Sequence, residues 1–240
     1  MSNNFFQFKQ FKIEQEHCAM KVCTDACLFG AWIVERLKSQ AYTKQINVLD
    51  IGTGTGLLSL MIAQEIECSM DAVEIDPAAA TQASSNFLEA NFASPITIIE
   101  SDVKDLKTSQ VYDCIFSNPP FFENDLKSPD AKRNKALHSE TLNLTELIQV
   151  IDKHLSQDGI TAILLPHHRK EEMIKLAVDR NLFPYANADI KQSSTHTFFR
   201  SFLAFSRKKQ TPLSEEIIIQ DNRVYSDRFI ELLQNYYLAF

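Results

Sequence analysis

The sequence predicts an α/β fold, with a mostly parallel sheet and helices on both of its faces. Three observations predict this fold. Short apolar runs typical of strands alternate with helical stretches along the chain. Several of these runs end in acidic, glycine or asparagine residues, as expected at the binding edge of an open sheet. The hydrophobic fraction of 45% is large enough for a substantial core.

The order of the elements follows from hydrophobic periodicity and turn signals. Residues 17–37 are expected to form a helical segment ahead of the first strand. Asp76 and Pro77 mark the start of a helix, because aspartate caps a helix and proline fits its first turn. A late strand, 201–206, is expected to pair antiparallel with 185–191. The remaining strands are predicted at 46–51, 71–75, 96–100, 113–117, 160–166 and 215–221, and the remaining helices at 56–66, 77–91, 144–155, 169–180 and 226–238.

The length of 240 residues fits a single domain. We expect one unit over residues 1–240, with an N-terminal helical extension (about 1–45) and a C-terminal strand–helix tail (about 212–240). Neither a signal peptide nor a membrane-spanning run is recognisable. Five cysteines, an odd number, favour a reducing compartment, so we expect a cytoplasmic protein. Their spacing fits no zinc pattern, and we expect no metal.

Three of the five glycines lie in one loop, LDIGTGTG. Gly52, Gly54 and Gly56 follow a predicted strand, where glycine lets the backbone approach a ligand closely. The spacing differs from the dinucleotide fingerprint G-x-G-x-x-G, because Leu57 stands where the third glycine of that fingerprint would be. Asp50 stands just before the loop, where its carboxylate suits a cationic group and disfavours a diphosphate. The loop therefore predicts a ligand that carries a positive charge.

Acidic residues follow the next two predicted strands. Glu74 ends the strand after the glycine loop and is placed to bind ribose hydroxyls. Asp102 follows the third strand and is placed to accept a hydrogen bond from an adenine amino group. Together with Asp50 and the glycines, these acids predict S-adenosylmethionine over the carboxyl ends of the strands. Strand-end capping or turn formation is the alternative role for Asp50 and Asp102. Two neighbours complete the predicted cofactor site: Asp76 and Val103.

The stretch SNPPFF follows the fourth predicted strand, at the same sheet edge. An amino group on an aromatic ring is a poor nucleophile, because its lone pair is delocalised. The side-chain oxygen of Asn118 and the carbonyl of Pro119 can accept both N–H groups and turn the lone pair outward, and the prolines fix this geometry in advance. An aromatic side chain here adds a stacking face worth about 1–3 kcal/mol per base. An ordinary turn with two core phenylalanines is the alternative. The predicted catalytic residues are Asn118, Pro119, Pro120 and Phe121, with Asn118 also contacting the cofactor.

The motifs LDIGTGTG, VEID and SNPPFF resemble the amino-methyltransferase branch of the S-adenosylmethionine-dependent methyltransferases. Nearly the whole chain resembles the bacterial tRNA1(Val) (adenine-37-N6) methyltransferases, most specifically in CAMKVCTDACLFGAW and in the terminal YSDRFIELLQNYYLAF. The resemblance implies a Rossmann-like methyltransferase fold with a mostly parallel, seven-stranded sheet that has one antiparallel strand. It implies methylation of N6 of adenine 37, beside the anticodon of a valine tRNA. It also implies that three residues close over the methionine end of the cofactor: Lys21, Thr24 and Asp25.

The chain departs from the family pattern at one position, and other substrates therefore stay possible. The family usually has tyrosine after the two prolines, whereas this chain has Phe121, which keeps the stacking face and loses a hydroxyl. NPPF also resembles guanine-N2 methyltransferases of ribosomal RNA. Corners of this kind occur in protein glutamine-N5 methyltransferases as well. A ribosomal RNA or a protein therefore stays an alternative substrate.

The net charge of −7 disfavours nucleic acid, but the charge is uneven. Segments 1–13, 127–138 and 191–209 hold nearly half of the 24 basic residues and almost none of the 31 acids. If they converge, they form a basic face for an anticodon stem-loop, with phenylalanines of the N-terminal stretch interleaved for stacking or packed on the core. Three separate solvated loops are the alternative. The oligomeric state stays open, with a monomer slightly favoured. The predicted RNA-binding residues are Lys9, Lys12, Lys132, Arg133, Lys135 and Arg200.

Overall fold

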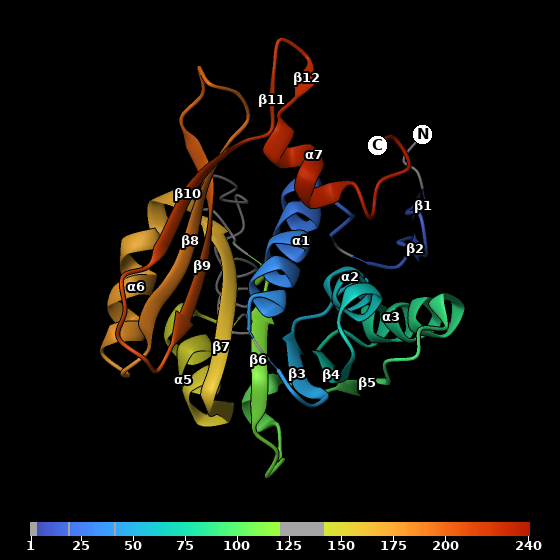
Figure 1. Ribbon diagram of the computed structural model, residues 1–240. Helices are drawn as coiled ribbons and strands as arrows, with labels where there is room; N and C mark the ends of the chain where they lie inside the picture. Colours follow the sequence, from blue (N-terminus) through green and yellow to red (C-terminus); the bar gives the residue numbers. More distant parts are fainter. Residues whose placement is uncertain (1–3, 19, 41, 121–141) are drawn as a thin grey trace, which may run out of the picture.

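The computed structural model describes residues 4–18, 20–40, 42–120 and 142–240 (Figure 1). Its main sheet has eight strands in this described part, in the order β10-β8-β9-β7-β6-β3-β4-β5. Only β9 runs antiparallel to its neighbours β7 and β8, and the other pairs are parallel. The strands are β3 (Ile46–Ile51), β4 (Cys68–Glu74), β5 (Ile96–Glu100), β6 (Tyr112–Ser117), β7 (Leu155–Pro166), β8 (Phe183–Lys191), β9 (Phe198–Ser206) and β10 (Leu213–Ile218).

This arrangement confirms the predicted fold class, including the single antiparallel strand and its pairing with β8. The strand count differs from the expected seven. The eighth strand, β10, comes from the C-terminal tail and extends the sheet by pairing in parallel with β8. It joins the sheet because Ile217 becomes fully buried at this edge. The tail strand is therefore part of the sheet.

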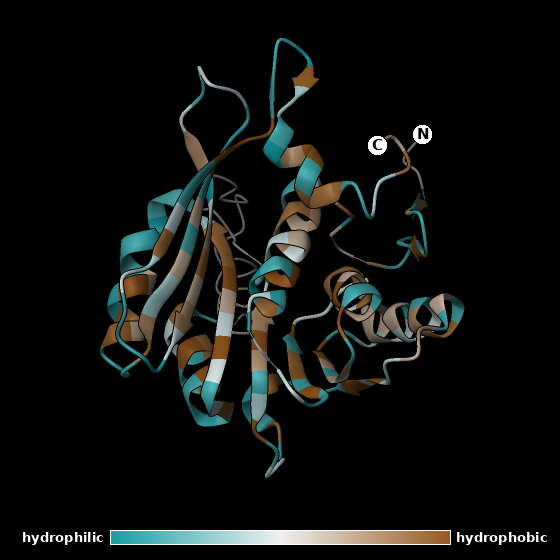
Figure 2. Cartoon of the chain, in the orientation of Figure 1, coloured by the Kyte–Doolittle hydropathy of each residue, from teal (hydrophilic) through white to brown (hydrophobic). Residues whose placement is uncertain are grey.

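Helices cover both faces of the sheet. One hydrophobic cluster joins the sheet to α1, α2 and α7, and a second joins it to α5 and α6 on the other face. Figure 2 shows hydrophobic colour concentrated where α1 and α2 meet the strands. The helices are α1 (Thr24–Lys38), α2 (Leu57–Glu65), α3 (Pro77–Ala90), α5 (Leu144–His154), α6 (Lys170–Val178) and α7 (Asp227–Leu233), with short 3-10 turns at η1 (Val103–Asp105) and η3 (His167–Arg169).

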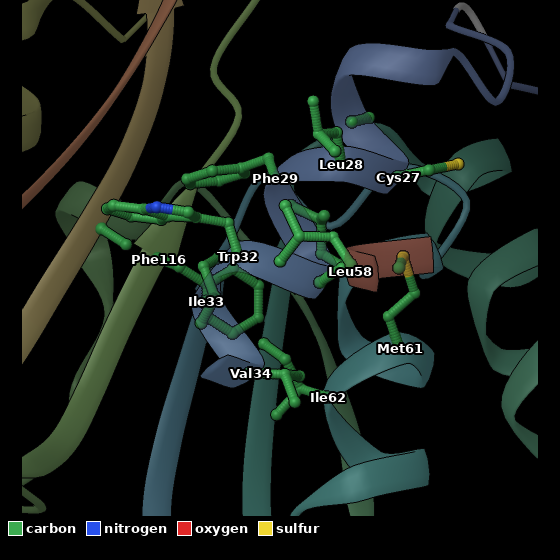
Figure 3. Packing of buried hydrophobic residues seen from close by; sticks show 14 of the residues in the cluster. Cys27, Leu28, Phe29, Trp32, Ile33, Val34, Leu58, Met61, Ile62 and Phe116 are labelled. Carbon is green, nitrogen blue, oxygen red and sulfur yellow. The ribbon is translucent and has the colours of Figure 1, made fainter. Parts of the chain in front are cut away.

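The largest fully buried side chain, that of Trp32, lies between α1 and the sheet. Trp32 and Phe29 stack with ring centroids 6.4 Å apart, and both contact Phe202 of β9. Figure 3 shows Phe29 and Trp32 near Phe116 of β6, with Met61 of α2 on the other side of α1. This core fixes α1 against the strands that carry the predicted site.

The N-terminal segment differs from its prediction. Helix α1 begins at Thr24, and the residues before it include a two-stranded hairpin of β1 (Phe5–Gln7) and β2 (Lys12–Glu14) instead of a continuous helical extension. Phe8 and Phe11 are buried and stack with centroids 4.5 Å apart. Burial of these two rings at the turn favours the hairpin, because apolar surface is removed from water.

The C-terminal helix is also shorter than predicted. Helix α7 ends at Leu233 rather than near residue 238. The ammonium group of Lys9 donates to the carbonyl oxygens of Gln234 (2.6 Å) and Phe240 (2.7 Å). The Gln234 carbonyl is thus bonded to a side chain where a longer helix would supply a backbone N–H. A second small hairpin, β11 (Gln220–Asp221) and β12 (Val224–Tyr225), precedes α7.

Asn86 of α3 connects the N-terminal hairpin to the glycine loop. Its side chain is fully buried. Its amide nitrogen donates to the carbonyls of Glu14 (2.9 Å) and Thr55 (2.8 Å), and its oxygen accepts from the Glu14 N–H (3.0 Å). The hairpin and the loop therefore share one hydrogen-bonding side chain.

Gly56 packs against α3 at the start of α2. It has φ of 80°, which favours glycine, and a Cβ atom there would lie 2.4 Å from Cε1 of Phe87. The glycine thus serves the packing of α2 on α3 as well as the conformation of the loop.

We expect Gly56→Ala to lower the free energy of unfolding by at least about 1–2 kcal/mol, because an L-residue is strained in the left-handed region. The contact with Phe87 adds to this cost. Urea unfolding measures the change. In a Phe87→Ala background the same substitution should cost less, since only the backbone strain remains. Equal costs in both backgrounds would contradict the packing role.

Candidate functional site

A cavity of about 220 Å³ opens at the carboxyl ends of β3, β4 and β6 and beside η1. It brings together residues that the sequence predicted separately on successive strands. Its wall includes residues that the sequence did not single out as ligand contacts, such as Cys18, Met20 and Ile75. The predicted site residues that line it are Gly52, Gly54, Glu74, Asp76, Asp102, Val103, Asn118, Pro119 and Pro120.

The glycine loop is fastened to the end of β4. The backbone N–H groups of Gly52 and Thr53 both donate to the carbonyl of Val73, over 2.9 and 3.1 Å. Gly52 and Gly54 have positive φ angles of 74° and 56°, and no atom lies within 4 Å of where their Cβ atoms would be. The loop therefore presents bare backbone to an open space, as close approach to a ligand requires.

Glu74 is held in place by two backbone N–H groups. Its Oε2 accepts from Gly54 (2.9 Å), and its Oε1 accepts from Asp76 (3.0 Å). The side chain is only 9% exposed, yet it lines the cavity. A carboxylate has about four acceptor positions, so both oxygens keep capacity for a ligand. This geometry suits two neighbouring hydroxyl groups, as on a ribose.

Asp76 caps the helix α3, Asp102 caps the short turn η1, and both line the cavity. Asp76 accepts from the N–H groups of Ala78 and Ala79 at the start of α3. Asp102 accepts from the N–H of Lys104 (2.9 Å) at the start of η1, and the Lys104 ammonium lies 3.3 Å from its other oxygen. Each of these two residues thus caps an element and lines the cavity, so the two roles do not exclude each other.

Asp50 lies beneath the glycine loop and is not among the residues that line the cavity. Its carboxylate is 1% exposed, and its Oδ2 accepts from the hydroxyls of Thr53 and Ser59, each over 2.7 Å. Within the described residues its Oδ1 has no hydrogen-bond partner. Burial raises the pKa of Asp50 to about 7, although the two hydroxyls act in the opposite direction. Asp50 therefore braces the loop against α2.

The end of β6 is tied to the end of β3. The hydroxyl of Ser117, which is fully buried, donates to the carbonyl of Ile51 over 2.8 Å. Asn118 comes directly after Ser117, half-buried and in the cavity wall, and its side chain has no hydrogen-bond partner within the described part of the chain. Asn118 thus lines the same cavity as the glycine loop, and its amide group is available to a ligand. Phe121 lies outside the described residues.

The start of α1 is separate from the cavity wall. Lys21 and Thr24 are exposed, and neither lines the cavity. Asp25 also stays outside the wall and accepts from Nε of Arg200 over 2.9 Å. Instead, the preceding residues Cys18 and Met20 line the cavity. Burial raises the pKa of the Cys18 thiol to about 11, and the charges of Glu74 and Asp76 add to this effect.

Ile75 is a cavity residue that a sequence signal could have identified. It is 56% exposed, although its side chain is large and apolar. It stands between Glu74 and Asp76, directly after β4. An exposed apolar side chain between two acids at a strand end suits the face of a planar ring.

The predicted RNA-binding residues divide into two groups. Lys132, Arg133 and Lys135 lie outside the described residues. The other three already contact protein acceptors: Lys9 binds the C-terminal carbonyls, Lys12 pairs with Glu14 (2.8 Å) and Glu89 (2.9 Å), and Arg200 pairs with Asp25. Phe8 and Phe11 belong to the core and offer no exposed stacking face.

The described residues contain no group of three or more His, Cys, Asp or Glu side chains arranged to hold a metal ion. Among them, none of the helices has the length and apolar character needed to cross a membrane.

Comparisons with known proteins agree with this geometry. Residues 30–177 match the family described as the methyltransferase small domain. The chain is 36% identical to a tRNA1(Val) (adenine(37)-N6)-methyltransferase of Bacteroides fragilis, with 99% of both chains covered. It is 37% identical to a protein of the same name from Yersinia enterocolitica, with 98% of this chain and 93% of the relative covered.

Solved structures show the same fold. A protein from Agrobacterium tumefaciens described as a predicted O-methyltransferase aligns with a TM-score of 0.65 at 13% identity, covering 88% of this chain and 95% of that one. A methyltransferase from Pyrococcus furiosus aligns with a TM-score of 0.54 at 22% identity, covering 76% and 83%. These similarities confirm the methyltransferase fold.

We expect Glu74→Gln to weaken the binding of S-adenosylmethionine about tenfold or more, because a hydrogen bond to a charged group contributes about 1.5–3 kcal/mol. The amide also places an N–H group against a backbone N–H of the loop. Calorimetric titration measures the affinity. Glu100→Gln is the matched control, since Glu100 pairs with Glu74 in the β4–β5 register and is exposed outside the cavity wall. Equal affinities for both variants would refute the role of Glu74.

Asp50 predicts a pH dependence of stability. Its pKa is about 7 in the folded protein and about 3.9 in an unfolded chain, so the folded state binds the proton more tightly. The stabilisation is complete below about pH 4 and is lost as the pH rises to about 7. Relative to Asp50→Asn, the protein should therefore lose roughly a few kcal/mol of unfolding free energy over this interval, since one pKa unit is about 1.4 kcal/mol.

Denaturant unfolding at pH 5, 6, 7 and 8 measures this difference. The control is Asp105→Asn, which changes an exposed carboxylate on η1. Its difference from the unaltered protein should stay constant across the same pH values. A constant difference for Asp50→Asn as well would show that Asp50 does not titrate in this interval.

Proposed function

The chain belongs to the tRNA1(Val) (adenine(37)-N6)-methyltransferase family, and from this membership we propose that it methylates N6 of adenine 37 in a valine tRNA. The observation that carries the proposal is one cavity in which a glycine loop, three acids and an Asn-Pro-Pro corner converge. Each part suits one portion of the two substrates. The relatives' names favour adenine N6 over guanine N2 and over glutamine.

The cavity fits S-adenosylmethionine, which supplies an electrophilic methyl group when bound. Gly52 and Gly54 leave room for the ligand against the backbone. Glu74 offers acceptor positions to the ribose hydroxyls, and Asp102 offers one to the adenine amino group. Ile75 adds an apolar surface for the adenine ring. The roles proposed for Lys21, Thr24 and Asp25 at the methionine end rest on the family resemblance.

Asn118 and Pro119 act on the amino group of the target base. The Asn118 side-chain oxygen and the Pro119 carbonyl accept its two N–H groups, which favours a pyramidal nitrogen and directs its lone pair toward the methyl group. The bond from Ser117 to Ile51 holds this corner against the glycine loop. Positioning of this kind lowers the entropic cost of the reaction. Phe121 is proposed to stack on the base.

The substrate is proposed to be presented as an anticodon stem-loop. A loop base is already outside a duplex, so its entry into the cavity costs little unpairing energy. Modification of a tRNA also suits the cytoplasm, where we expect the protein. The carboxyl edge of the sheet is the surface that faces this substrate.

The proposed function is tested with labelled S-adenosylmethionine and two substrate pools, total RNA and total protein. The expected product is N6-methyladenosine in the tRNA fraction, identified after digestion to nucleosides. A synthetic valine tRNA with guanosine at position 37 should accept no label. Label in N2-methylguanosine, or in protein glutamine, would contradict the proposal and favour one of the other substrate classes.

We expect Asn118→Ala to lower kcat on the order of 100-fold or more, as does the loss of a catalytic hydrogen-bonding group. The unfolding temperature should change little, since the Asn118 side chain has no hydrogen-bond partner among the described residues. The affinity for S-adenosylmethionine should fall far less than kcat. Asn118→Asp, which keeps an acceptor oxygen, should retain more activity than the alanine variant. Near-normal turnover by Asn118→Ala would assign the corner to folding alone.

A further inference from the structure

We propose that the β11–β12 hairpin and the loop of residues 192–197, together the docking loops, form a docking surface for the sugar-phosphate backbone of the tRNA. Arg223 is its phosphate contact. This surface rests on the proposed function, because it identifies where that substrate is held away from the reacting base.

The docking loops project from the same sheet edge as the Asn-Pro-Pro corner. In the parallel β6–β7 pair, Ser117 lies opposite Ile163 near the end of β7. The last residue of β7, Pro166, lies opposite Arg200 at the start of β9. The last residue of β8, Lys191, pairs with Ile218 at the end of β10, and the hairpin begins two residues later. Figure 1 shows both loops at the top of the view, the loop of residues 192–197 above β8 and β9 and the hairpin above α7.

The distance from the catalytic corner suits a backbone contact. Four strand spacings separate β6 from β10, and each spacing is about 4.8 Å, which gives roughly 20 Å along the edge. This is too far for contact with the target base. It suits a contact with the sugar-phosphate backbone of the tRNA stem instead. Phosphate contacts of this kind fix the orientation of a nucleic acid without reading its sequence.

Hydrogen bonds join the two docking loops into one unit. The N–H and the hydroxyl of Ser194 both donate to Oδ1 of Asp221, each over 2.9 Å. The backbone N–H groups of Ile219 and Gln220 donate to the carbonyls of Lys191 and Gln192. The hairpin is therefore held by the loop next to it, and its tip has a defined position relative to the sheet.

The tip of the hairpin has an arginine, Arg223, in a left-handed backbone conformation that favours glycine. Asn222 and Arg223 connect β11 to β12 with φ angles of 49° and 66°. A two-residue hairpin turn with two positive φ angles strongly favours Asn-Gly. Arginine at the second position is strained where glycine is not. Backbone strain of this kind tends to occur at functional positions, which suggests that the side chain of Arg223 is retained for its chemistry.

The guanidinium group of Arg223 is available to a partner. Within the described ranges it makes neither a hydrogen bond nor an ion pair, and the residue is exposed. Other cations at this edge are engaged: Lys191 pairs with Glu216 (2.8 Å), and Arg200 pairs with Asp25 (2.9 Å). Figure 2 shows mainly hydrophilic and neutral colours along the loop of residues 192–197 and the hairpin tip, with a hydrophobic colour at β12, where Val224 is exposed. Such a surface suits a phosphate better than an apolar peptide, and the fork of arginine matches phosphate geometry.

The test compares two replacements of Arg223. Arg223→Gly removes the charge and relieves the left-handed conformation, so the protein should unfold at the same or a higher temperature. Its binding to valine tRNA should weaken several-fold, and the slope of log K against log salt should fall by roughly 0.7–0.9, the value for one phosphate contact. Arg223→Lys should retain most of the slope. The affinity for S-adenosylmethionine should be unchanged in both variants.

Lys107→Gln is the matched control for net charge. Lys107 is exposed and lies in the connection between η1 and β6 rather than in the docking loops, and no ion pair to it is found in the described part of the chain. This variant should leave the salt slope unchanged. If Arg223→Gly also leaves it unchanged while tRNA is still methylated, the docking surface is wrong and the proposed function stands. If the unaltered protein neither binds nor methylates tRNA, both proposals fail.

Discussion

The parallel register at Ile51 is the constraint on which the site depends. Ile51 lies opposite Val73 of β4 on one side and Ser117 of β6 on the other. Three strands thus end at the same level, and the segments that leave their carboxyl ends face the same space. Two further contacts hold this alignment, from Val73 to the glycine loop and from Ser117 to Ile51. The cavity is therefore a property of strand pairing before it is a property of any ligand-binding side chain.

The sequence predicted well the features that are determined locally. Strands 46–51 and 96–100 were predicted with the bounds that the structure shows, because each is an apolar run between clear turn signals. Glu74, Asp102 and Asn118 were placed in one site because each lies at or just past the end of a strand, and parallel strands end at one edge. In all three cases the signal lies within a few residues of the feature that it predicts.

The features that the sequence did not predict depend on distant partners. The pairing of Arg200 with Asp25 joins residues 175 positions apart, so each charge has a protein partner that no local pattern indicates. Lys9 donates to carbonyls 225 and 231 positions away, so its exposed ammonium group already has protein acceptors that no local pattern indicates. Only tertiary packing decides these two cases. Asp50 is different: it was expected to face the ligand, and the hydroxyls that hold it beneath the loop come from Thr53 and Ser59, three and nine positions away.

The shared side chain of Asn86 links the N-terminal hairpin to the order of the glycine loop. Its amide group bonds to Glu14 and to Thr55 at once, so a shift of the loop disturbs the bond that protects the Glu14 N–H. The rate at which the Glu14 amide hydrogen exchanges with solvent therefore reports how ordered the glycine loop is. Isotope labelling at one position, 72 residues from Asn86 in sequence, would thus register when the loop tightens.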